Sequence, residues 1–367
     1  MQRVPLLLIL AVGVAAAASP LRNFATTIQL ETAAETSANV SIGDLDGDRD
    51  LDLVLAKGRH DPLRDRVLLN DGKGGFVASN LGPDADRTYT AALTDADGDG
   101  DLDVLTSNDT PDRKLVFLNN GKGQFIVAGT WGVAKWSTRN AAVADLNGDG
   151  RPDVIAANRP GPSYACLNLG DGRFQTDCIE VPAKSATTIV PADFDRDGFI
   201  DLAVPARDGG PNQIFFNDGK AGFARTTTFG PADNNGRVGA TGDFDGNGTA
   251  DLMVGDEIAS TMIVYLNDGT GRLTESFRFE DKKKNPYAGT VGDLNRDGSP
   301  DIVFGFTEGP HLVFFNDGTG RAFTKVTFGD PAGAAYGFAL GDINRDGFPD
   351  IALARSGAPN VLYLSGK

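Results

Sequence analysis

The residues best suited to chemistry lie in an acidic ten-residue pattern that the chain repeats seven times. Positions 1, 3, 5 and 9 of every copy are Asp or Asn, whereas positions 2 and 10 are apolar. Oxygen ligands at alternating positions of a tight loop can converge on one hard cation, and Ca²⁺ accepts about six to eight oxygens in irregular geometry. The candidate metal ligands are therefore Asp44, Asp46, Asp48 and Asp52; Asp95, Asp97, Asp99 and Asp103; Asp145, Asn147, Asp149 and Asp153; Asp193, Asp195, Asp197 and Asp201; Asp243, Asp245, Asn247 and Asp251; Asp293, Asn295, Asp297 and Asp301; and Asp342, Asn344, Asp346 and Asp350.

An EF-hand and a Mg²⁺ site both fit the acidic pattern less well. An EF-hand loop begins in a similar way, but it needs a Glu at position 12 and a helix on each side. Position 12 here is apolar or Thr, and β-rich runs follow position 9. Mg²⁺ demands a stricter octahedron than such loops provide. Acidic surface turns without a metal remain an alternative, although each would hold mutually repelling carboxylates. We therefore expect up to seven structural Ca²⁺ sites in loops between strands.

A second motif alternates with the acidic one. It reads LLNDGKGGF at 68–76 and FFNDGKAGF at 215–223, and six copies occur in step with the acidic loops. Asn-Asp-Gly between apolar runs predicts a tight hairpin turn, because Asn and Gly accept positive φ. Each unit of about 50 residues then contains four strands. Seven such units predict an all-β fold, a seven-bladed β-propeller with four antiparallel strands per blade.

The two ends of the chain together supply the four strands of a single blade. Phe24 lies 20 residues before Asp44, the same spacing that separates the Phe of each hairpin motif from the next acidic loop. Residues 23–30 therefore form a fourth strand without a blade of their own. The last unit ends in NVLYLSGK, which supplies a third strand but no fourth. We expect the N-terminal strand to pair with the last blade, which closes the ring and removes an open sheet edge.

The N-terminal residues and the net charge restrict the kinds of protein that this chain could be. Residues 1–18 contain an apolar run followed by AAAA, which predicts a secretory signal peptide cleaved near Ala18. Residues 19–367 then form a single propeller domain in a secreted, periplasmic or extracellular protein. The net charge is −16, and 24 of the 50 acidic residues are candidate metal ligands. Acidity of this kind excludes a nucleic-acid-binding role, and we expect no membrane span.

The two cysteines flank a predicted hairpin. Cys166 and Cys178 are equidistant from the turn LGDGRF, so they should face each other on neighbouring strands. Exported proteins meet oxidising conditions. We therefore predict a disulfide between them, with two buried thiols as the alternative.

Together the two motifs resemble the FG-GAP/VCBS repeat family, whose members include the seven-bladed head of integrin α-subunits. The resemblance covers the chain from about Phe24 to Lys367. It implies that Ca²⁺ is bound by the side chains at positions 1, 3, 5 and 9 and by the carbonyl at position 7, which is Phe199 in the fourth blade. The first loop departs from the pattern, because position 6 is Arg49 where the other loops have Gly. We expect its site to be the weakest, since Arg is costly at positive φ.

The candidate ligand face is the end of the ring opposite the acidic loops, because its loops vary while the blades stay constant. Its candidate residues are Arg59, His60, Trp136 and Arg139. Trp131 and Trp136 could stack on a sugar, with packing between the blades as the alternative. Both histidines, His60 and His311, are expected to be exposed in loops of that face. The first hypothesis is an interaction scaffold for a protein or cell-surface partner, without enzymatic activity. A calcium-dependent carbohydrate-binding protein is the alternative, and a polysaccharide lyase is a weaker one.

Overall fold

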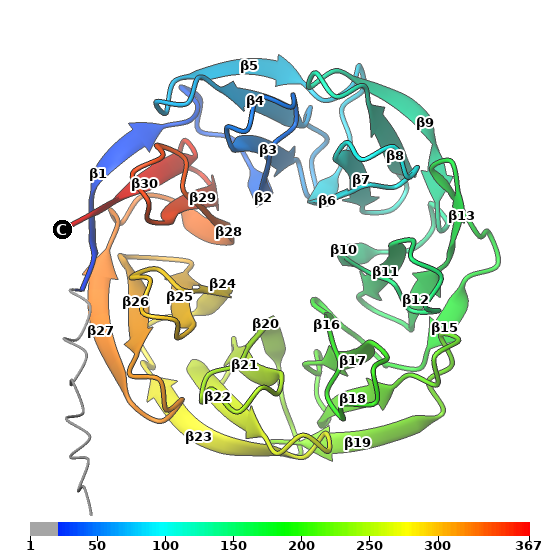
Figure 1. The fold of residues 1–367 in the computed structure, drawn as a ribbon, viewed down its shortest axis with the longest axis vertical. Coiled ribbons are helices and arrows are strands. Elements are labelled where there is room, and N and C mark those ends of the chain that lie inside the picture. The colour runs from blue at the N-terminus through cyan, green and yellow to red at the C-terminus, as the bar shows by residue number, and fades with distance from the viewer. Residues whose placement is uncertain (1–20) are drawn as a thin grey trace, which may run out of the picture.

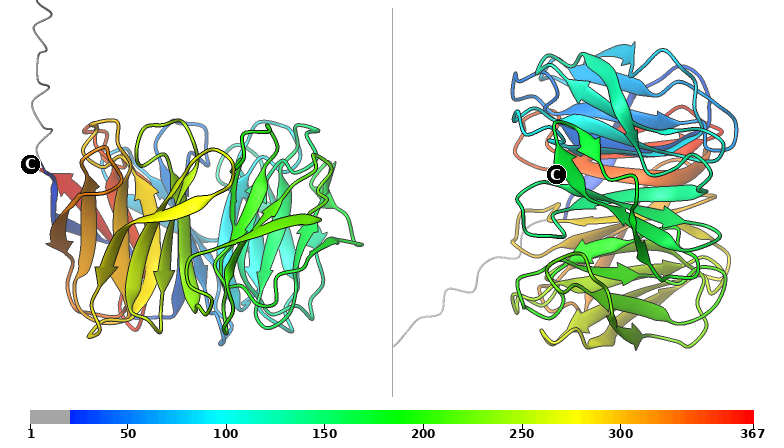
Figure 2. Two further views of the ribbon diagram at one scale, coloured as in Figure 1. Left: turned by 90° about the horizontal axis from the view of Figure 1, so that it is seen from below. Right: turned by 90° about the vertical axis from the view of Figure 1, so that its right-hand side faces the viewer.

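Seven four-stranded sheets form a closed ring around a central axis in the computed structural model, which describes residues 21–367 (Figure 1). The side views show a short cylinder with turns gathered at its two ends (Figure 2). Each sheet is antiparallel and runs from an inner strand at the axis to an outer strand at the rim. The predicted seven-bladed β-propeller is therefore confirmed.

The first three blades, from inner to outer strand, are β2 (Ser37–Gly43), β3 (Asp52–Lys57), β4 (Arg66–Asn70) and β5 (Phe76–Asn80); β6 (Thr88–Thr94), β7 (Asp103–Asn108), β8 (Lys114–Asn119) and β9 (Phe125–Trp131); and β10 (Thr138–Ala144), β11 (Asp153–Asn158), β12 (Ser163–Cys166) and β15 (Ile179–Val181). The next two are β16 (Val190–Ala192), β17 (Asp201–Val204), β18 (Asn212–Phe216) and β19 (Arg225–Phe229); and β20 (Gly236–Gly242), β21 (Asp251–Asp256), β22 (Thr261–Asn267) and β23 (Leu273–Glu280). The last two are β24 (Pro286–Gly292), β25 (Asp301–Phe306), β26 (His311–Asn316) and β27 (Phe323–Phe328); and β28 (Ala334–Gly341), β29 (Asp350–Ser356), β30 (Val361–Gly366) and β1 (Asn23–Gln29).

Burial explains the composition of the strands. The second strand of a blade, such as β3 or β7, is buried at every residue, because neighbouring blades cover both of its faces. In β3 the residues after the first Asp are therefore an apolar run, LVLA. The outer strand β5 is exposed at four of its five residues, because it forms the edge of its sheet.

The N-terminal strand closes the ring as the spacing predicted. β1 pairs antiparallel with β30, and Thr26 lies opposite Leu364. Phe24 is only 3% exposed and packs with Phe328 and other residues of the last two blades. The first and last strands therefore complete one sheet.

The third blade contains an additional hairpin and a disulfide. β13 (Asn168–Gly170) and β14 (Arg173–Phe174) pair with each other between β12 and β15. Cys166 ends β12, Cys178 precedes β15, and the two form a disulfide with Cα atoms 4.5 Å apart. The predicted disulfide is confirmed.

The predictions of a signal peptide and of no membrane span concern features outside these sheets. The predicted signal peptide, residues 1–18, lies outside the described residues. Within residues 21–367, the structure contains no helix long and apolar enough to cross a membrane.

Candidate functional site

The seven acidic loops lie at one end of the ring. Each loop begins where an inner strand ends, as Asp44 does after β2, and its position-9 Asp opens the second strand, as Asp52 does in β3. Because all inner strands run in the same direction, the loops form a circle around the axis. The blade repeat thus converts seven separate sequence motifs into one acidic face.

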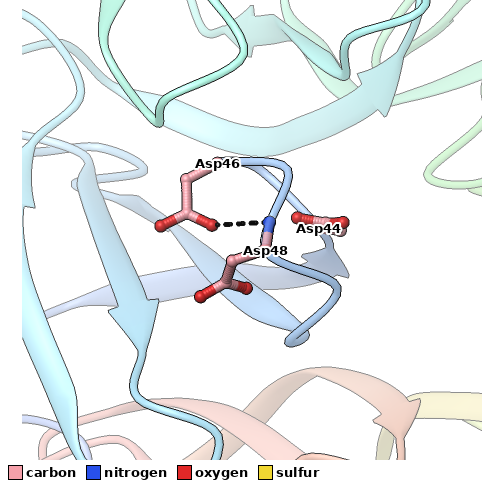
Figure 3. A group of neighbouring side chains, drawn as sticks. All are labelled: Asp44, Asp46 and Asp48. Carbon is pink, nitrogen blue, oxygen red and sulfur yellow. Dashed lines mark hydrogen bonds between the residues drawn. The ribbon is translucent and has the colours of Figure 1, made fainter.

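Carboxylate oxygens gather within four of these loops. One oxygen of each residue lies within 4.8 Å of the others in the groups Asp44, Asp46 and Asp48; Asp95, Asp97 and Asp99; Asp193, Asp195 and Asp197; and Asp243, Asp245 and Asp251. Figure 3 shows the first group, in which Asp46 accepts a hydrogen bond from the amide of Asp48. The remaining three loops have Asn at position 3, and there the Asn amide donates to the position-5 Asp (Asn147, Asn295 and Asn344).

The donor set of the fourth loop fits a hard cation. Asp193 Oδ2 accepts from the amide of Gly198 at 2.9 Å, and Asp197 Oδ1 accepts from that of Phe199 at 2.9 Å. The buried Oδ1 atoms of Asp193 and Asp195 have no hydrogen-bond partner among the described residues. Buried carboxylate oxygens need such compensation. A Ca²⁺ held by this all-oxygen set would supply it.

The position-9 Asp has a structural role as well as a candidate ligand role. Asp201 is fully buried; its Oδ2 accepts from the amide of Phe194 at 3.0 Å, and its Oδ1 accepts from that of Asn217 at 2.8 Å. The same pair of bonds recurs in the other blades, for example at Asp52. This Asp therefore ties its loop to the end of the third strand. Asp251 is the position-9 Asp that also joins a group of three carboxylates.

We expect the stability of the metal-stripped protein to fall as pH rises from about 4 to about 7. Burial raises the pKa of Asp201 from 3.8 to about 6 and that of Asp301 to about 7. A carboxyl group with a raised pKa in the folded state favours folding while it is protonated, and this contribution is lost as pH rises through the folded-state pKa. Melting temperatures between pH 4.5 and pH 7.5, measured without divalent ions, test this. A melting temperature that rises over that range would contradict it.

Two positions of every loop adopt left-handed backbone conformations. At position 6 the six glycines have φ between 79° and 96°, and Arg49 has φ 73° in the first loop. At position 4 three loops also place an arginine at positive φ, namely Arg196, Arg296 and Arg345. The expected strain at Arg49 is therefore present, but the loop still gathers its three carboxylates. Whether its Ca²⁺ affinity is the weakest stays a prediction.

Replacing Arg49 with Gly should raise the free energy of unfolding by about 0.5–1 kcal/mol. A left-handed conformation costs a side-chain-bearing residue about 1–2 kcal/mol, and the larger freedom of Gly in the unfolded chain offsets about 0.5–1 kcal/mol of that. Arg64→Gly is the control, because Arg64 is exposed and has no positive φ. Urea unfolding of both variants measures the difference. A stability loss for Arg49→Gly as large as that of Arg64→Gly would show that the strain is absent.

The Asn of each hairpin motif connects neighbouring blades. Asn119, at the end of β8, donates from Nδ2 to Leu102 O in its own blade at 3.0 Å and to Leu45 O in the loop of the first blade at 2.8 Å. The corresponding Asn70 donates to Ile343 O of the seventh blade at 2.9 Å. The motif therefore contributes more than the turn that its sequence predicts. Sequence reasoning missed this second role, which the structure alone reveals.

Asn119→Ala should destabilise the protein by about 2 kcal/mol, because it removes two bonds to buried carbonyls, each of which costs about 1–3 kcal/mol when left unsatisfied. Leu45 O keeps the bond from the amide of Gly123, which limits the loss. The neighbouring Asn120→Ala is the matched control, since Asn120 is exposed in the same turn. Chemical unfolding of the two variants gives the comparison. Equal effects would mean that the link between blades adds nothing to stability.

The opposite end of the ring contains a cavity of about 200 Å³ on the axis. Residues near the start of the inner strands, such as Arg139, line it together with residues of the loops between second and third strands, such as Arg59 and His60. Three of the four candidate ligand-face residues therefore meet in one place. Sequence reasoning missed Tyr89, Tyr287 and Tyr336, which also line this cavity. Each lies six residues before the first Asp of an acidic loop, which is the signal that could have revealed them.

His60 and Arg139 share a hydrogen-bonded cluster at the cavity wall. Tyr89 Oη lies 3.0 Å from His60 Nε2 and accepts from Arg139 Nη1 at 2.6 Å. Asp109 Oδ2 lies 2.7 Å from Arg139 Nη1 and 3.6 Å from His60 Nδ1. The His60 side chain is 60% exposed, as expected. Burial, together with nearby Arg139 and Arg59, lowers the pKa of His60, which favours a neutral imidazole near pH 7.

The structure corrects two expectations for this face and restricts a third. His311 is 1% exposed, because it opens β26 and packs against Phe328 and Phe338. Trp131 is 1% exposed in the core, so it cannot contact a sugar. Trp136 is half-buried and stacks on Tyr164 with ring centroids 4.2 Å apart, which covers one face of its ring.

Comparisons with known proteins agree with this architecture. The FG-GAP-like repeat model matches residues 44–106, 95–156, 145–204, 193–254, 243–304 and 293–353. No curated protein matches the chain in sequence. Among solved structures, BBS1N in complex with ARL6DN is similar at 12% identity and a TM-score of 0.62, covering 94% of this chain and 96% of that one. An Agrocybe aegerita lectin that recognises non-reducing terminal N-acetylglucosamine is similar at 19% identity and a TM-score of 0.59, covering 91% of this chain and 86% of that one. On the six matched segments, the chain belongs to the FG-GAP-like repeat family.

Proposed function

We propose that this protein is an exported, Ca²⁺-stabilised β-propeller that acts as an interaction scaffold, without enzymatic activity. The face opposite the acidic loops binds its protein or cell-surface partner. The observation that carries this proposal is the polarity of the ring. One end gathers carboxylates, and the other opens into a cavity that, among residues 21–367, is lined by four arginines and no Asp or Glu. The disulfide between Cys166 and Cys178 supports export to an oxidising compartment.

The loops before the inner strands provide residues with which to test this face. Lys135, Lys282 and Lys283 are exposed there, outside the cavity. Lys73, Lys122 and Lys220 are exposed in the hairpin turns of the acidic end and form a matched control set. The Ca²⁺-loaded protein should recover a partner from a cell-envelope fraction. Conversion of the first three lysines to Glu should abolish recovery, and conversion of the control set should not. Equal recovery by both variants would contradict the assignment of the face.

A calcium-dependent carbohydrate-binding function is the second candidate. The cavity supports it, because Asn39, Thr90 and Asn140 offer polar groups for sugar hydroxyls beside tyrosine rings. The structural similarity to a lectin is consistent with this candidate, but at 19% identity the similarity shows a shared fold and not a shared ligand. Glycan-array binding in Ca²⁺ that Trp136→Ala abolishes would favour this candidate. An array without binding would exclude the glycans tested.

A polysaccharide lyase is the weaker alternative. His60 is the candidate base, but it is largely exposed and is engaged by Tyr89. Turnover of an acidic polysaccharide that His60→Ala abolishes would establish an enzyme and overturn the scaffold proposal.

A further inference from the structure

Six of the seven inner strands have a register shift at the same place. In each, one residue is skipped in the pairing with the second strand, as Tyr89 is between Thr88 and Thr90. A β-bulge of this kind re-aims a side chain and is common beside functional sites. All six skipped residues line the axial cavity, and they are Ala38, Tyr89, Arg139, Arg237, Tyr287 and Tyr336. Six blades therefore each contribute the residue at the same position of the repeat to the wall of this one cavity.

Two of the four arginines that line the cavity are already neutralised. Arg139 Nη1 lies 2.7 Å from Asp109, and Arg159 Nη2 lies 2.6 Å from Asp208. Arg59 and Arg237 are the two remaining arginines of the cavity, and neither has a carboxylate within about 3 Å of its guanidinium group among the described residues. Their surroundings decide what the cavity could bind.

Arg59 has no carboxylate within ion-pair distance among the described residues. Its guanidinium carbon lies 3.7 Å from the ring centroid of Tyr336, and Nη1 donates to Ser356 Oγ at 3.3 Å. Its buried Nε finds no acceptor in residues 21–367. The backbone of Arg59 is held at φ 56°, a strained conformation for a residue with a side chain. Strain of this kind persists where the surroundings enforce it, and it is frequent at binding sites.

Arg237 is similarly under-satisfied. Its guanidinium carbon lies 3.2 Å from the ring centroid of Tyr287 and 5.8 Å from that of Tyr336, so Arg59 and Arg237 both lie near the ring of Tyr336. Glu257 Oε2 is 3.5 Å from Arg237, but it is closer to Arg207, at 2.6 Å. The Nε of Arg237 is buried and lacks an acceptor in the described part of the chain. A buried donor without an acceptor is costly, which favours an external acceptor here.

We propose that Arg59 and Arg237 bind an oxyanion group, carried by a small polar molecule such as a sugar acid, inside this axial cavity. Guanidinium groups match carboxylates and other oxyanions with paired, charge-assisted hydrogen bonds. Tyr287 and Tyr336 hold the two guanidinium groups and form the adjoining walls. The volume of about 200 Å³ suits a ligand smaller than drug-sized molecules. This inference deepens the proposed function, because it rests on the binding role of this face and adds the chemistry of the ligand.

Calorimetric titration of the Ca²⁺-loaded protein with sodium glucuronate tests the site, with glucose as the uncharged probe. Glucuronate should bind, and glucose should bind at least about tenfold more weakly, because it cannot form charge-assisted hydrogen bonds with the two guanidinium groups. Arg59→Gln and Arg237→Gln should each weaken glucuronate binding by about tenfold or more. Arg278→Gln is the matched control, because Arg278 lies on the outer strand β23 and pairs with Glu275. It should leave binding unchanged.

Inorganic sulfate and phosphate distinguish the source of the anion. Displacement of glucuronate by either would assign the site to oxyanions in general, and lack of displacement would assign it to carboxylates; both outcomes support the proposal. Equal binding of glucose and glucuronate, no glucuronate binding at 10 mM (about 100-fold weaker than a ~0.1 mM ligand), or full binding by Arg59→Gln would overturn it. If Arg237→Gln does not fold, Arg59→Gln decides alone. Because the lysine variants above leave the cavity intact, partner recovery can fail or succeed independently of this titration.

Discussion

Removal of divalent ions is expected to lower the melting temperature of this protein by about 20 °C. Sites of this kind bind Ca²⁺ with dissociation constants of roughly 10⁻⁴–10⁻³ M. At Ca²⁺ concentrations well above that, each occupied site would stabilise the folded state by about 1–2 kcal/mol, and the seven proposed sites together by about 10 kcal/mol. A domain of this size shifts by about 2 °C for each kcal/mol. The unpaired oxygens of Asp193 and Asp195 are the local reason to expect a large effect.

Thermal unfolding in EDTA, and after return of Ca²⁺ or Mg²⁺, measures this effect. Ca²⁺ should restore the melting temperature fully and Mg²⁺ only in part, because Mg²⁺ requires stricter geometry. Asp195→Asn should reduce the response to Ca²⁺ by one site, whereas Asp171→Asn, at an exposed Asp in the turn of the third blade, should leave it unchanged. A shift of less than a few degrees in EDTA would mean that the acidic loops are stable without a cation.

Phe24→Ala is expected to destabilise the protein by about 3–5 kcal/mol, the usual range for a buried Phe replaced by Ala. Phe24 lies on β1, which supplies the outer strand of the last blade. Its ring packs 5.7 Å from that of Phe328 in the sixth blade. The substitution therefore loosens the closure of the ring as well as creating a cavity. Urea-induced unfolding followed by circular dichroism measures the loss.

Ile126→Ala is the matched control for this closure. Ile126 lies on the outer strand β9 of the second blade, where its side chain is 69% exposed. Its replacement should change stability by about 0.5 kcal/mol or less. Limited proteolysis should also cut the Phe24→Ala variant faster near its N-terminal strand. If the two variants unfold at the same urea concentration, β1 does not hold the ring closed.

The amino-acid sequence determined the blades, the closure and the candidate metal loops. Each of these depends on a local pattern, such as the alternating Asp residues from Asp193 or the hairpin turn after Asn217, repeated at a constant spacing. A local pattern specifies its own loop or turn wherever the chain places it. The spacing of Phe24 from Asp44 specified the last strand for the same reason. The disulfide followed from the symmetry of Cys166 and Cys178 about one turn.

The tertiary structure decided the second role of the hairpin Asn, the burial of His311 and the composition of the axial cavity. The cavity brings together Arg59, Arg237 and Tyr336, which are far apart in the chain; Arg237 and Tyr336 share one position of the repeat, whereas Arg59 lies in a loop between a second and a third strand. They meet because the ring places seven inner strands around one axis (Figure 1), and because the residues skipped at the bulges, such as Arg237 and Tyr336, line the axial cavity. Neither the curvature nor the bulge follows from the alternation of apolar and polar residues along a single strand. The metal loops could therefore be identified from the sequence, whereas the arginine site required the closed ring.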